Sequence, residues 1–277
     1  MKNILIAINA EKLNISDVDF GCQMATLSGS RLTGIFLENQ SVSEVPALKT
    51  VFGMPYVETI VASDIPEYDK RMAILEENIR LFNEICTKRG VQHSIHLDKS
   101  IPLKEIKLES RFADLLVINS AIHFDGEPEG ELSAFASDIL AESECPVVVS
   151  PTNFTRIEEI VFTYDGSAAA AFAIRQFANI FPELDEEKIT VVQVNEPTGD
   201  VDEQNLKQYL RMHYSNVSFH MLDGDTNHEL IKFLFNRTKA LVVMGAYSRS
   251  KLSRAFFPST AEKLIKGLSL PIFIAHP

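Results

Sequence analysis

The sequence lacks the marks of several protein classes. It contains no uninterrupted apolar stretch approaching the ~20 residues that cross a bilayer. Its first residues enter a strand pattern without a cleavable leader, so we expect a cytoplasmic protein with no membrane partner. The three cysteines, Cys22, Cys86 and Cys145, are far apart and include no C-x-x-C pair, so neither a disulfide framework nor a cysteine metal site is predicted. We expect buried, reduced thiols.

Positive charge is also scarce. The net charge is −12, from 26 Lys and Arg against 38 Asp and Glu. Residues 1–150 carry 13 basic and 23 acidic side chains, giving −10, and residues 151–277 carry 13 and 15, giving −2. Contact with a nucleic-acid backbone needs a basic face, so nucleic acid is not an expected partner. The local exception is Arg249, Lys251 and Arg254, which either hold an anion or form an ordinary solvated loop face.

Catalytic motifs are missing too. The chain has neither a G-x-S-x-G nucleophile motif nor a Walker G-x-x-x-x-G-K-[ST] loop, and no spacing joins a nucleophile to a base. We therefore expect no enzyme activity beyond slow ATP hydrolysis, and no catalytic residue is assigned. His93 and His96 lie three apart in a predicted strand, which places them on opposite faces, so no metal site is expected there.

The chain does contain an internal repeat. Residues 115–118, Leu-Leu-Val-Ile, lead through a loop and a helical stretch to 145–149, Cys-Pro-Val-Val-Val. Residues 241–244, Leu-Val-Val-Met, lead in the same way to 270–274, Leu-Pro-Ile-Phe-Ile. The spacing from Leu115 to Pro146 is 31 residues, and from Leu241 to Pro271 it is 30. We interpret the two halves as copies of one unit.

Short β-type runs alternate with helical patterns in both copies. The strands are expected at residues 4–8, 32–37, 93–97, 115–118 and 147–149, and at 160–163, 189–194, 217–221, 241–244 and 272–275. This alternation predicts an α/β fold of two tandem doubly wound domains, each a five-stranded parallel sheet flanked by helices, Rossmann-like in architecture. We place domain 1 at 1–151 and domain 2 at 152–277, and expect the closely joined copies to dock. Ser167 and Thr226 are expected helix caps.

The first copy carries an insertion in the region 38–70. Leu37 and His96 are 59 residues apart, whereas the corresponding Val194 and His220 are 26 apart. The extra segment holds Pro46, Pro55 and Pro66 among apolar residues. It either packs on the other domain or on a second chain, or forms a partly ordered surface loop.

Candidate ligand-binding residues follow the strands of the second copy. Ligands of open parallel sheets settle outside the carboxyl ends of the strands, where the strand order reverses. The residues there are Tyr164-Asp165-Gly166-Ser167, Asn195 and the loop from Gly245 to Ser248, and Pro258-Ser259-Thr260 then opens a helix. The free N–H groups and positive dipole end of a helix N-terminus suit a phosphate.

In these residues the chain resembles the universal stress protein family, over nearly the whole length of both copies. Nucleotide-binding members carry G-x-x-G, nine residues and G-S or G-T, with an aspartate ending strand one. The second copy has Gly245-x-x-Ser248, nine residues and Pro258-Ser259, so it keeps the spacing while two of the three glycines are replaced. Those replacements bear on how closely the backbone can approach a triphosphate.

Carried over position by position, the resemblance implies an adenine-nucleotide site in domain 2. The residues implied to contact adenosine are Thr163, Tyr164 and Asp165, with Val194 and Met244 on the adenine side. Those implied to surround the phosphates are Gly245, Ser248, Ser259 and Thr260, with Arg249 beside them. The residues also allow simpler roles: Asp165 as a turn or helix-cap residue, and Gly245 as the hinge of a tight turn.

The first copy departs from the family pattern at the same positions. Asn9 stands in place of the aspartate, Asn119 in place of the first glycine, and Ser133-Ala134 in place of Pro258-Ser259. Four acidic residues at 125, 127, 129 and 131 would repel a triphosphate. We therefore expect a structural or regulatory copy without nucleotide.

The sequence thus predicts a universal-stress-type protein that binds ATP or another adenine nucleotide in domain 2 as a regulatory ligand in a stress response, with Mg²⁺ bridging the phosphates. The expected partners are the intramolecular domain pair, a homodimer and an unidentified regulatory protein. The alternative is an interaction module with vestigial pockets, whose short apolar fifth strands, 147–149 and 272–275, pair at sheet edges within the tandem or between chains. A third reading is a pocket adapted to a different small ligand.

Overall fold

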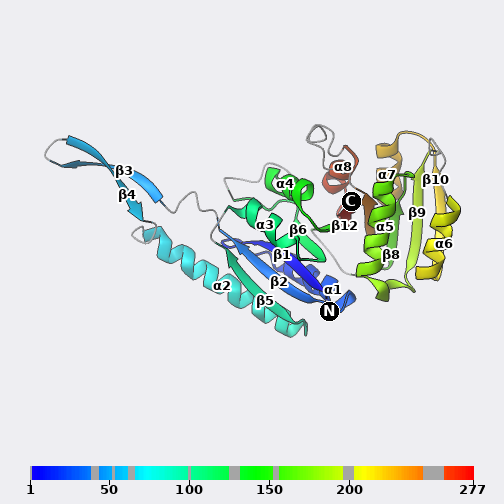
Figure 1. Ribbon diagram of the computed structural model, residues 1–277, viewed down its shortest axis with the longest axis horizontal. Helices are drawn as coiled ribbons and strands as arrows, with labels where there is room; N and C mark the ends of the chain where they lie inside the picture. Colours follow the sequence, from blue (N-terminus) through cyan, green and yellow to red (C-terminus); the bar gives the residue numbers. More distant parts are fainter. Residues whose placement is uncertain are drawn as a thin grey trace.

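A computed structural model describes the backbone of residues 2–38, 44–51, 54–61, 66–98, 101–124, 132–151, 156–195, 203–245 and 259–277. These residues form a long α/β body with a projecting arm (Figure 1). The elements of the first half are β1 (Asn3–Asn9), α1 (Ile15–Leu27), β2 (Arg31–Leu37), β3 (Glu44–Val51), β4 (Met54–Val61), α2 (Pro66–Lys88), β5 (His93–Asp98), α3 (Pro102–Ser110), β6 (Leu115–Asn119), α4 (Ala134–Glu142) and β7 (Val147–Ser150).

The second half repeats this order without the hairpin. Its elements are β8 (Glu159–Thr163), α5 (Ala168–Ile180), β9 (Lys188–Val194), α6 (Glu203–His213), β10 (Asn216–Leu222), α7 (Thr226–Leu234), β11 (Ala240–Gly245), α8 (Ser259–Gly267) and β12 (Ile272–Ala275). Every strand predicted from the apolar runs is present, with bounds that differ by at most one residue at either end. The α/β fold prediction is confirmed.

Ten strands form one continuous sheet in the order β10-β9-β8-β11-β12-β7-β6-β1-β2-β5. Within each half the strands are parallel, and their order reverses between β1 and β6 and between β8 and β11. The two halves meet where β12 pairs antiparallel with β7, with Phe273 opposite Val148. The predicted pairing of the fifth strands within the tandem is therefore confirmed.

Two apolar layers cover the sheet, one on each face. One layer packs α1, α2, α5 and α6 against the strands, and it includes both Val148 and Phe273. The other packs α3, α4, α7 and α8, and it includes both Val149 and Ile272. Both layers cross the junction between the halves, and burial of a side chain such as Phe273 contributes about 1.5–3 kcal/mol. The tandem is therefore joined by shared apolar packing as well as by strand pairing.

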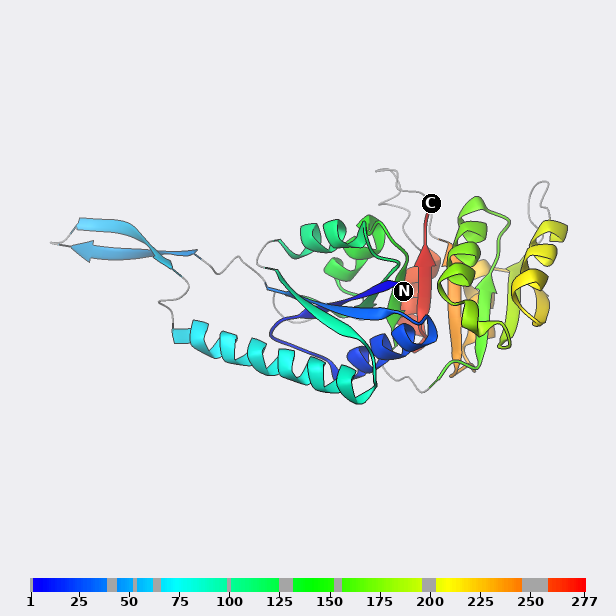
Figure 2. The ribbon, with the colours of Figure 1, turned by 60° about the horizontal axis from the view of Figure 1, so that its bottom comes forward.

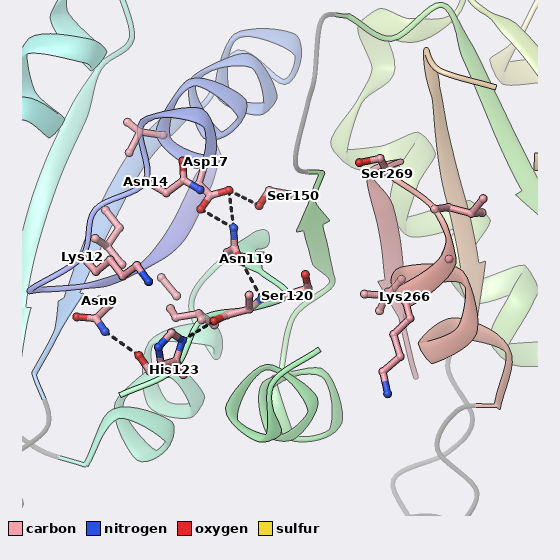
Figure 3. Close-up of a pocket in the computed structure, with 18 residues that line it drawn as sticks. Asn9, Lys12, Asn14, Asp17, Asn119, Ser120, His123, Ser150, Lys266 and Ser269 are labelled. Atoms are coloured by element: carbon pink, nitrogen blue, oxygen red, sulfur yellow. Dashed lines mark hydrogen bonds between the residues drawn. The ribbon is translucent and has the colours of Figure 1, made fainter. Parts of the chain in front are cut away.

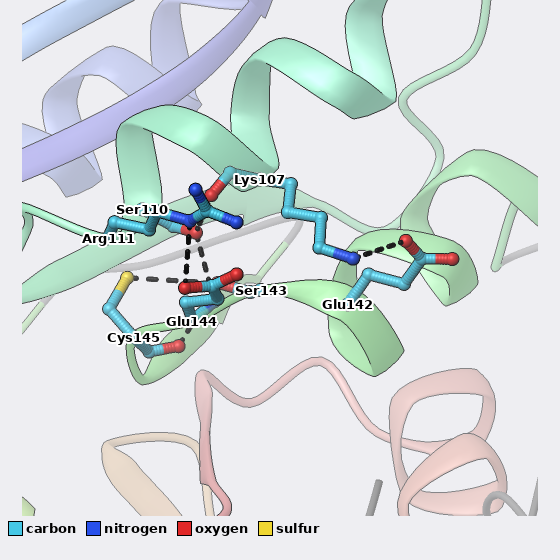
Figure 4. Close-up of polar contacts among 7 residues, drawn as sticks. All are labelled: Lys107, Ser110, Arg111, Glu142, Ser143, Glu144 and Cys145. Carbon is cyan, nitrogen blue, oxygen red and sulfur yellow. Dashed lines mark hydrogen bonds and ion pairs between the residues drawn. The ribbon is translucent and has the colours of Figure 1, made fainter. Parts of the chain in front are cut away.

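Polar contacts tie α3 to the end of α4 (Figure 4). The fully buried Ser110 hydroxyl donates to the Lys107 carbonyl at 2.9 Å and accepts from the Glu144 backbone N–H at 2.9 Å. Arg111 pairs with the Glu144 carboxylate at 3.0 Å, and Lys107 pairs with Glu142 at 3.3 Å. This cluster fixes the turn that leads into β7.

Helix ends follow the expected chemistry, with one correction. Asn14 caps α1 by accepting from the Ser16 N–H, and Ser167 caps α5 by accepting from the Ala170 N–H. The expected cap Thr226 is instead the first residue of α7, and Asp225 is the cap, accepting from the His228 N–H. Asp is as good a cap as Thr, so the residue before a predicted cap competes for the role.

The insertion forms an arm. β3 and β4 pair antiparallel as a two-stranded sheet of their own, with Leu48 opposite Val57. In Figures 1 and 2 this hairpin lies beyond the N-terminal end of α2, on the side of the molecule away from the second half. The hairpin therefore does not lie on the other domain, which was one of the expected locations.

Candidate functional site

The candidate site of the second half lies at the carboxyl ends of β8, β9 and β11. β8 is hydrogen-bonded to β9 on one side and to β11 on the other, and the helices that follow β8 and β11, α5 and α8, lie on opposite faces of the sheet. Such a reversal leaves a crevice at the strand ends, which is where open α/β sheets bind ligands. The structure brings Thr163, Val194, Met244 and Gly245 to these strand ends.

The end of β8 is only partly open to a ligand. The Thr163 hydroxyl donates to the Val243 carbonyl at 3.2 Å, and the Tyr164 side chain is buried. Asp165 is exposed, and its Oδ1 accepts from the Ser167 N–H at 2.9 Å. Asp165 is thus a turn residue two positions before the cap, Ser167, and one of its two carboxylate oxygens is engaged in that turn.

Asn195 is a polar anchor that sequence reasoning noted only by its position. It has a positive φ of 62°, its amide donates to the Gly224 carbonyl at 2.9 Å, and its Oδ1 accepts from the Gly224 N–H at 3.0 Å. Asparagine tolerates this backbone conformation better than most residues. The pair ties the end of β9 to the end of β10, and Val194 next to it is half-buried against the α7–α8 layer.

Gly245 has a packing role. A Cβ at this position would lie 2.4 Å from the Ala169 carbonyl carbon and 2.5 Å from the Ala170 nitrogen. The N-terminal turn of α5 therefore rests directly on the end of β11, which only glycine allows. This conflict with the backbone of another element is a reason for glycine that is separate from the expected tight turn, whose following residues lie outside the described part of the chain. Met244 before it is buried.

The candidate phosphate side is partly described. α8 begins at Ser259, and Thr260 in its first turn is half-buried. Ser248 and Arg249, like Lys251, Arg254 and Pro258, lie outside the described residues. The structure therefore places a helix N-terminus where the sequence expected one, and the loop that would complete the phosphate contacts remains a prediction.

In the first half, polar residues at the equivalent positions are held by hydrogen bonds. The Asn119 amide nitrogen lies 3.0 and 2.8 Å from the two carboxylate oxygens of Asp17, and the Ser150 hydroxyl donates to Asp17 Oδ1 at 2.6 Å. The Asn9 amide donates to the His123 carbonyl at 2.7 Å. Asp17 lies in the first turn of α1, as Ala170 does in α5, so Asn119 and Asp17 take the place of the direct contact at Gly245.

Burial is the main influence on the Asp17 carboxyl group. It raises the pKa of Asp17, while the hydrogen bonds from Ser150 and Asn119 lower it less. A carboxylate in the first turn of α1 also occupies the electropositive end of that helix. An anionic ligand would therefore meet a negative charge here. The signal that could have revealed Asp17 from the sequence is Asn119 itself, an amide where the second half has a glycine.

A cavity of about 630 Å³ lies over these residues. Its floor includes Asn9, Asp17, Asn119 and Ser150, and its opposite wall is residues 265–269 of the second half. Figure 3 shows Lys266 and Ser269 on that wall, across from Lys12 and Asn14. The crevice of the first half is thus bounded by both repeats.

The histidines and cysteines behave as structural residues. His93 contacts Asn83 of α2 at 3.1 Å, whereas His96 contacts Glu109 of α3 at 2.8 Å, so the two lie on opposite faces as predicted. All three cysteines are free and buried, and Cys22 Sγ lies 3.7 Å from Cys86 Sγ. Over the residues that the structure describes, no group of three or more His, Cys, Asp or Glu could hold a metal ion. The described helices include none that could cross a membrane.

Comparison with known proteins shows which family this chain is similar to. A model of the universal stress protein family matches residues 198–276. A universal stress protein of Synechocystis sp. is 22% identical over 288 residues, covering 98% of this chain and 99% of the relative. Residues 198–276 thus match the universal stress protein family, and the chain as a whole is similar to a full-length universal stress protein.

Solved structures agree on the fold of this tandem chain. One from Archaeoglobus fulgidus, a universal stress protein, superimposes with a TM-score of 0.70 at 16% identity, covering 99% of this chain and 98% of that chain. A functionally unknown protein from Pseudomonas aeruginosa gives 0.61 at 14% identity, covering 100% and 93%. The likeness spans both repeats, so the tandem arrangement is shared with these proteins.

Proposed function

We propose that the second repeat of this chain binds an adenine nucleotide, ATP in the first instance, as a regulatory ligand. Occupancy would bias association with partner proteins, and binding would occur without turnover. The observation that carries the proposal is the reversal of strand order between β8 and β11, whose carboxyl ends lie side by side, with α8 beginning at Ser259 after β11. Similarity to the universal stress protein family supports the same conclusion.

The described residues fit separate parts of a nucleotide. The exposed Asp165 keeps one carboxylate oxygen outside its turn hydrogen bond, and it is suited to accept from ribose hydroxyls. Met244 and Val194 offer apolar surface to a base. Ser259 and Thr260 begin α8, whose free N–H groups and hydroxyls favour phosphate oxygens, with Arg249 and a bridging Mg²⁺ as the neutralising charges.

Isothermal titration of the full chain with Mg·ATP tests the proposal. We expect Asp165→Ala to weaken ATP and adenosine alike, and Thr260→Val to weaken ATP more than adenosine, because Thr260 is assigned to the phosphates. Asp225→Ala is a matched control, since Asp225 is also an exposed aspartate that accepts from a helix N–H but lies at α7. Absence of binding to the unmodified protein at millimolar nucleotide would refute the proposal.

The first repeat serves as an internal reference for this titration. With Asp17 at its crevice and Asn119 in place of a glycine, we propose that it takes no nucleotide. The expected stoichiometry is therefore one nucleotide per chain, and it should be unaffected by Asn9→Ala. Two equivalent sites would contradict the assignment of the first repeat as a non-binding copy.

The alternative function, an interaction module with vestigial pockets, is favoured by one observation. The polar groups of the first crevice are already bonded to each other, so that crevice at least is built for structure. Mass spectrometry of small molecules released from freshly purified protein distinguishes the two functions, because only the first yields a nucleotide.

A further inference from the structure

Antiparallel pairing of β7 with β12 joins the two halves and leaves two strands at the ends of the ten-stranded sheet. One is β5 in the first half and the other is β10 in the second half. Within the described part of the chain, each is paired with a strand on one side only. An end strand presents a row of backbone N–H and C=O groups to whatever approaches it, so proteins usually protect it.

β10 has few of the usual protections. Its sequence, Asn-Val-Ser-Phe-His-Met-Leu, contains no charged residue and no proline. Phe219 is 39% exposed and Met221 is 57% exposed. A seven-residue uncharged end strand with exposed apolar side chains is the kind of edge that pairs with another chain.

The direction of the backbone groups on β10 follows from one hydrogen bond. The Leu222 carbonyl accepts from the Asn195 N–H at the end of β9, so Leu222 directs its backbone groups toward β9. Backbone direction alternates along a strand, and therefore Val217, Phe219 and Met221 direct their N–H and C=O groups away from β9. Phe219 and Met221 thus combine exposed side chains with outward backbone groups.

We propose that β10 is the interface between two copies of this chain, which pair antiparallel through this strand about a two-fold axis. A two-fold axis makes β10 its own partner and satisfies the outward groups of both copies at once. The same kind of antiparallel edge pairing already joins β7 to β12 within the chain. The inference does not depend on nucleotide binding.

Charge favours a second copy at β10 over one at β5. Residues 1–150 carry a net charge of −10, whereas residues 151–277 carry −2. Bringing two first halves together would oppose like charges, while two second halves meet with little repulsion. The uncharged strand itself adds none.

Light scattering coupled to size-exclusion chromatography tests the proposal on the full chain. We expect a mass of twice 31.0 kDa for the unmodified protein. Phe219→Glu places one carboxylate on each side of the two-fold axis. Within each chain, Lys207 can pair with the introduced carboxylate, because its ammonium lies 5.2 Å from the Phe219 ring centroid. We expect this variant to raise the dimer dissociation constant about tenfold or more, a cost of about 1.4 kcal/mol.

Two controls make the result specific. Phe112→Glu removes a more exposed phenylalanine, at 87%, beyond α3 in the other half, and should remain dimeric. Met221→Pro and Met221→Thr both remove the thioether, but only proline also removes an outward N–H, so we expect the proline variant to dissociate more readily. Far-UV circular dichroism should be used to check that each variant is folded.

Three outcomes would overturn the proposal. The first is an unmodified protein that stays at 31.0 kDa at the highest concentration reached. The second is a dimer that tolerates Phe219→Glu and Met221→Pro, which would place the interface elsewhere. The third is a dimer lost in Phe112→Glu alone, which would assign the contact to the first half.

Discussion

The Asn119 amide nitrogen lies 3.0 and 2.8 Å from the two carboxylate oxygens of Asp17, joining the end of β6 to the first turn of α1. The second half has neither residue, and its Gly245 instead lies directly under the backbone of α5. The two repeats therefore hold the same helix against the same strand by different means, one polar and one by close packing.

The polar contact between Asn119 and Asp17 should make the stability of the protein depend on pH. The pKa of Asp17 is raised in the folded state by burial, so the folded protein binds this proton more tightly than the unfolded chain does. The associated stability is fully present below the unfolded pKa and is lost as the pH rises through the folded pKa. Urea denaturation from acidic to neutral pH should show a smaller such loss in Asp17→Asn, whose amide oxygen can still accept from Asn119 and Ser150. Identical pH profiles for both proteins would contradict this.

The close packing of Gly245 against α5 predicts that stability is sensitive to one added methyl group. Gly245→Ala places a Cβ 2.4 Å from the Ala169 carbonyl carbon, and neither backbone can yield cheaply. We expect the free energy of unfolding to fall by about 1–3 kcal/mol or more, measured by urea denaturation. Gly267→Ala is the control, because its Cβ would meet nothing within 4 Å, and it should be neutral or slightly stabilising. Equal effects of the two substitutions would show that α5 can move away from β11.

Ser110 and Arg111 both contact Glu144, and they should differ greatly in importance. Ser110→Ala leaves the part-buried Glu144 N–H without its acceptor, which costs about 1–3 kcal/mol. Arg111→Ala breaks an ion pair whose arginine side chain is 46% exposed, and we expect a cost of about 0–1 kcal/mol. Thermal unfolding of the two variants measures the difference. A larger effect for Arg111→Ala would contradict this ranking.

The cysteines should be unreactive in the folded protein. All three are buried, and burial raises the pKa of the Cys145 thiol to about 12, so almost no thiolate is present at neutral pH. Titration with Ellman's reagent at pH 8 should label none of them quickly in the native state and all three in denaturant. Fewer than three reactive thiols in denaturant would indicate a disulfide, with Cys22 and Cys86 as the pair close enough to form it.

Much of the fold could be predicted from the sequence because its strands are apolar on both faces. Runs such as 115–118 and 241–244 have no polar face, which is typical of a buried parallel sheet, and all ten predicted strands occur. Counting back from the X-Pro-apolar landmarks also aligned the start of α4, at Ala134, with the start of α8, at Ser259. These signals are local, and local signals can be recovered from the sequence.

Contacts between distant residues could not be predicted in the same way. Local sequence patterns do not reveal that Asp17 is hydrogen-bonded to Asn119 and Ser150. Nor do they reveal that Asn195 is hydrogen-bonded to Gly224, or that Gly245 lies against Ala169. The sequence marked Gly245 as special but suggested a tight turn or a phosphate, because the helix pressing on it comes from a segment about seventy-five residues earlier. The site assignments at Ser248 and Arg249 stay predictions, since they lie outside the described residues.

One helix touches both crevices of the molecule. α8 begins at Ser259, on the proposed phosphate side of the second repeat, and ends at Gly267, in the wall of the 630 Å³ cavity of the first. Nine helical residues extend about 13 Å and move nearly as a rigid rod. A ligand that pulls on the start of this rod would also displace its far end, so the first repeat would register occupancy of the second.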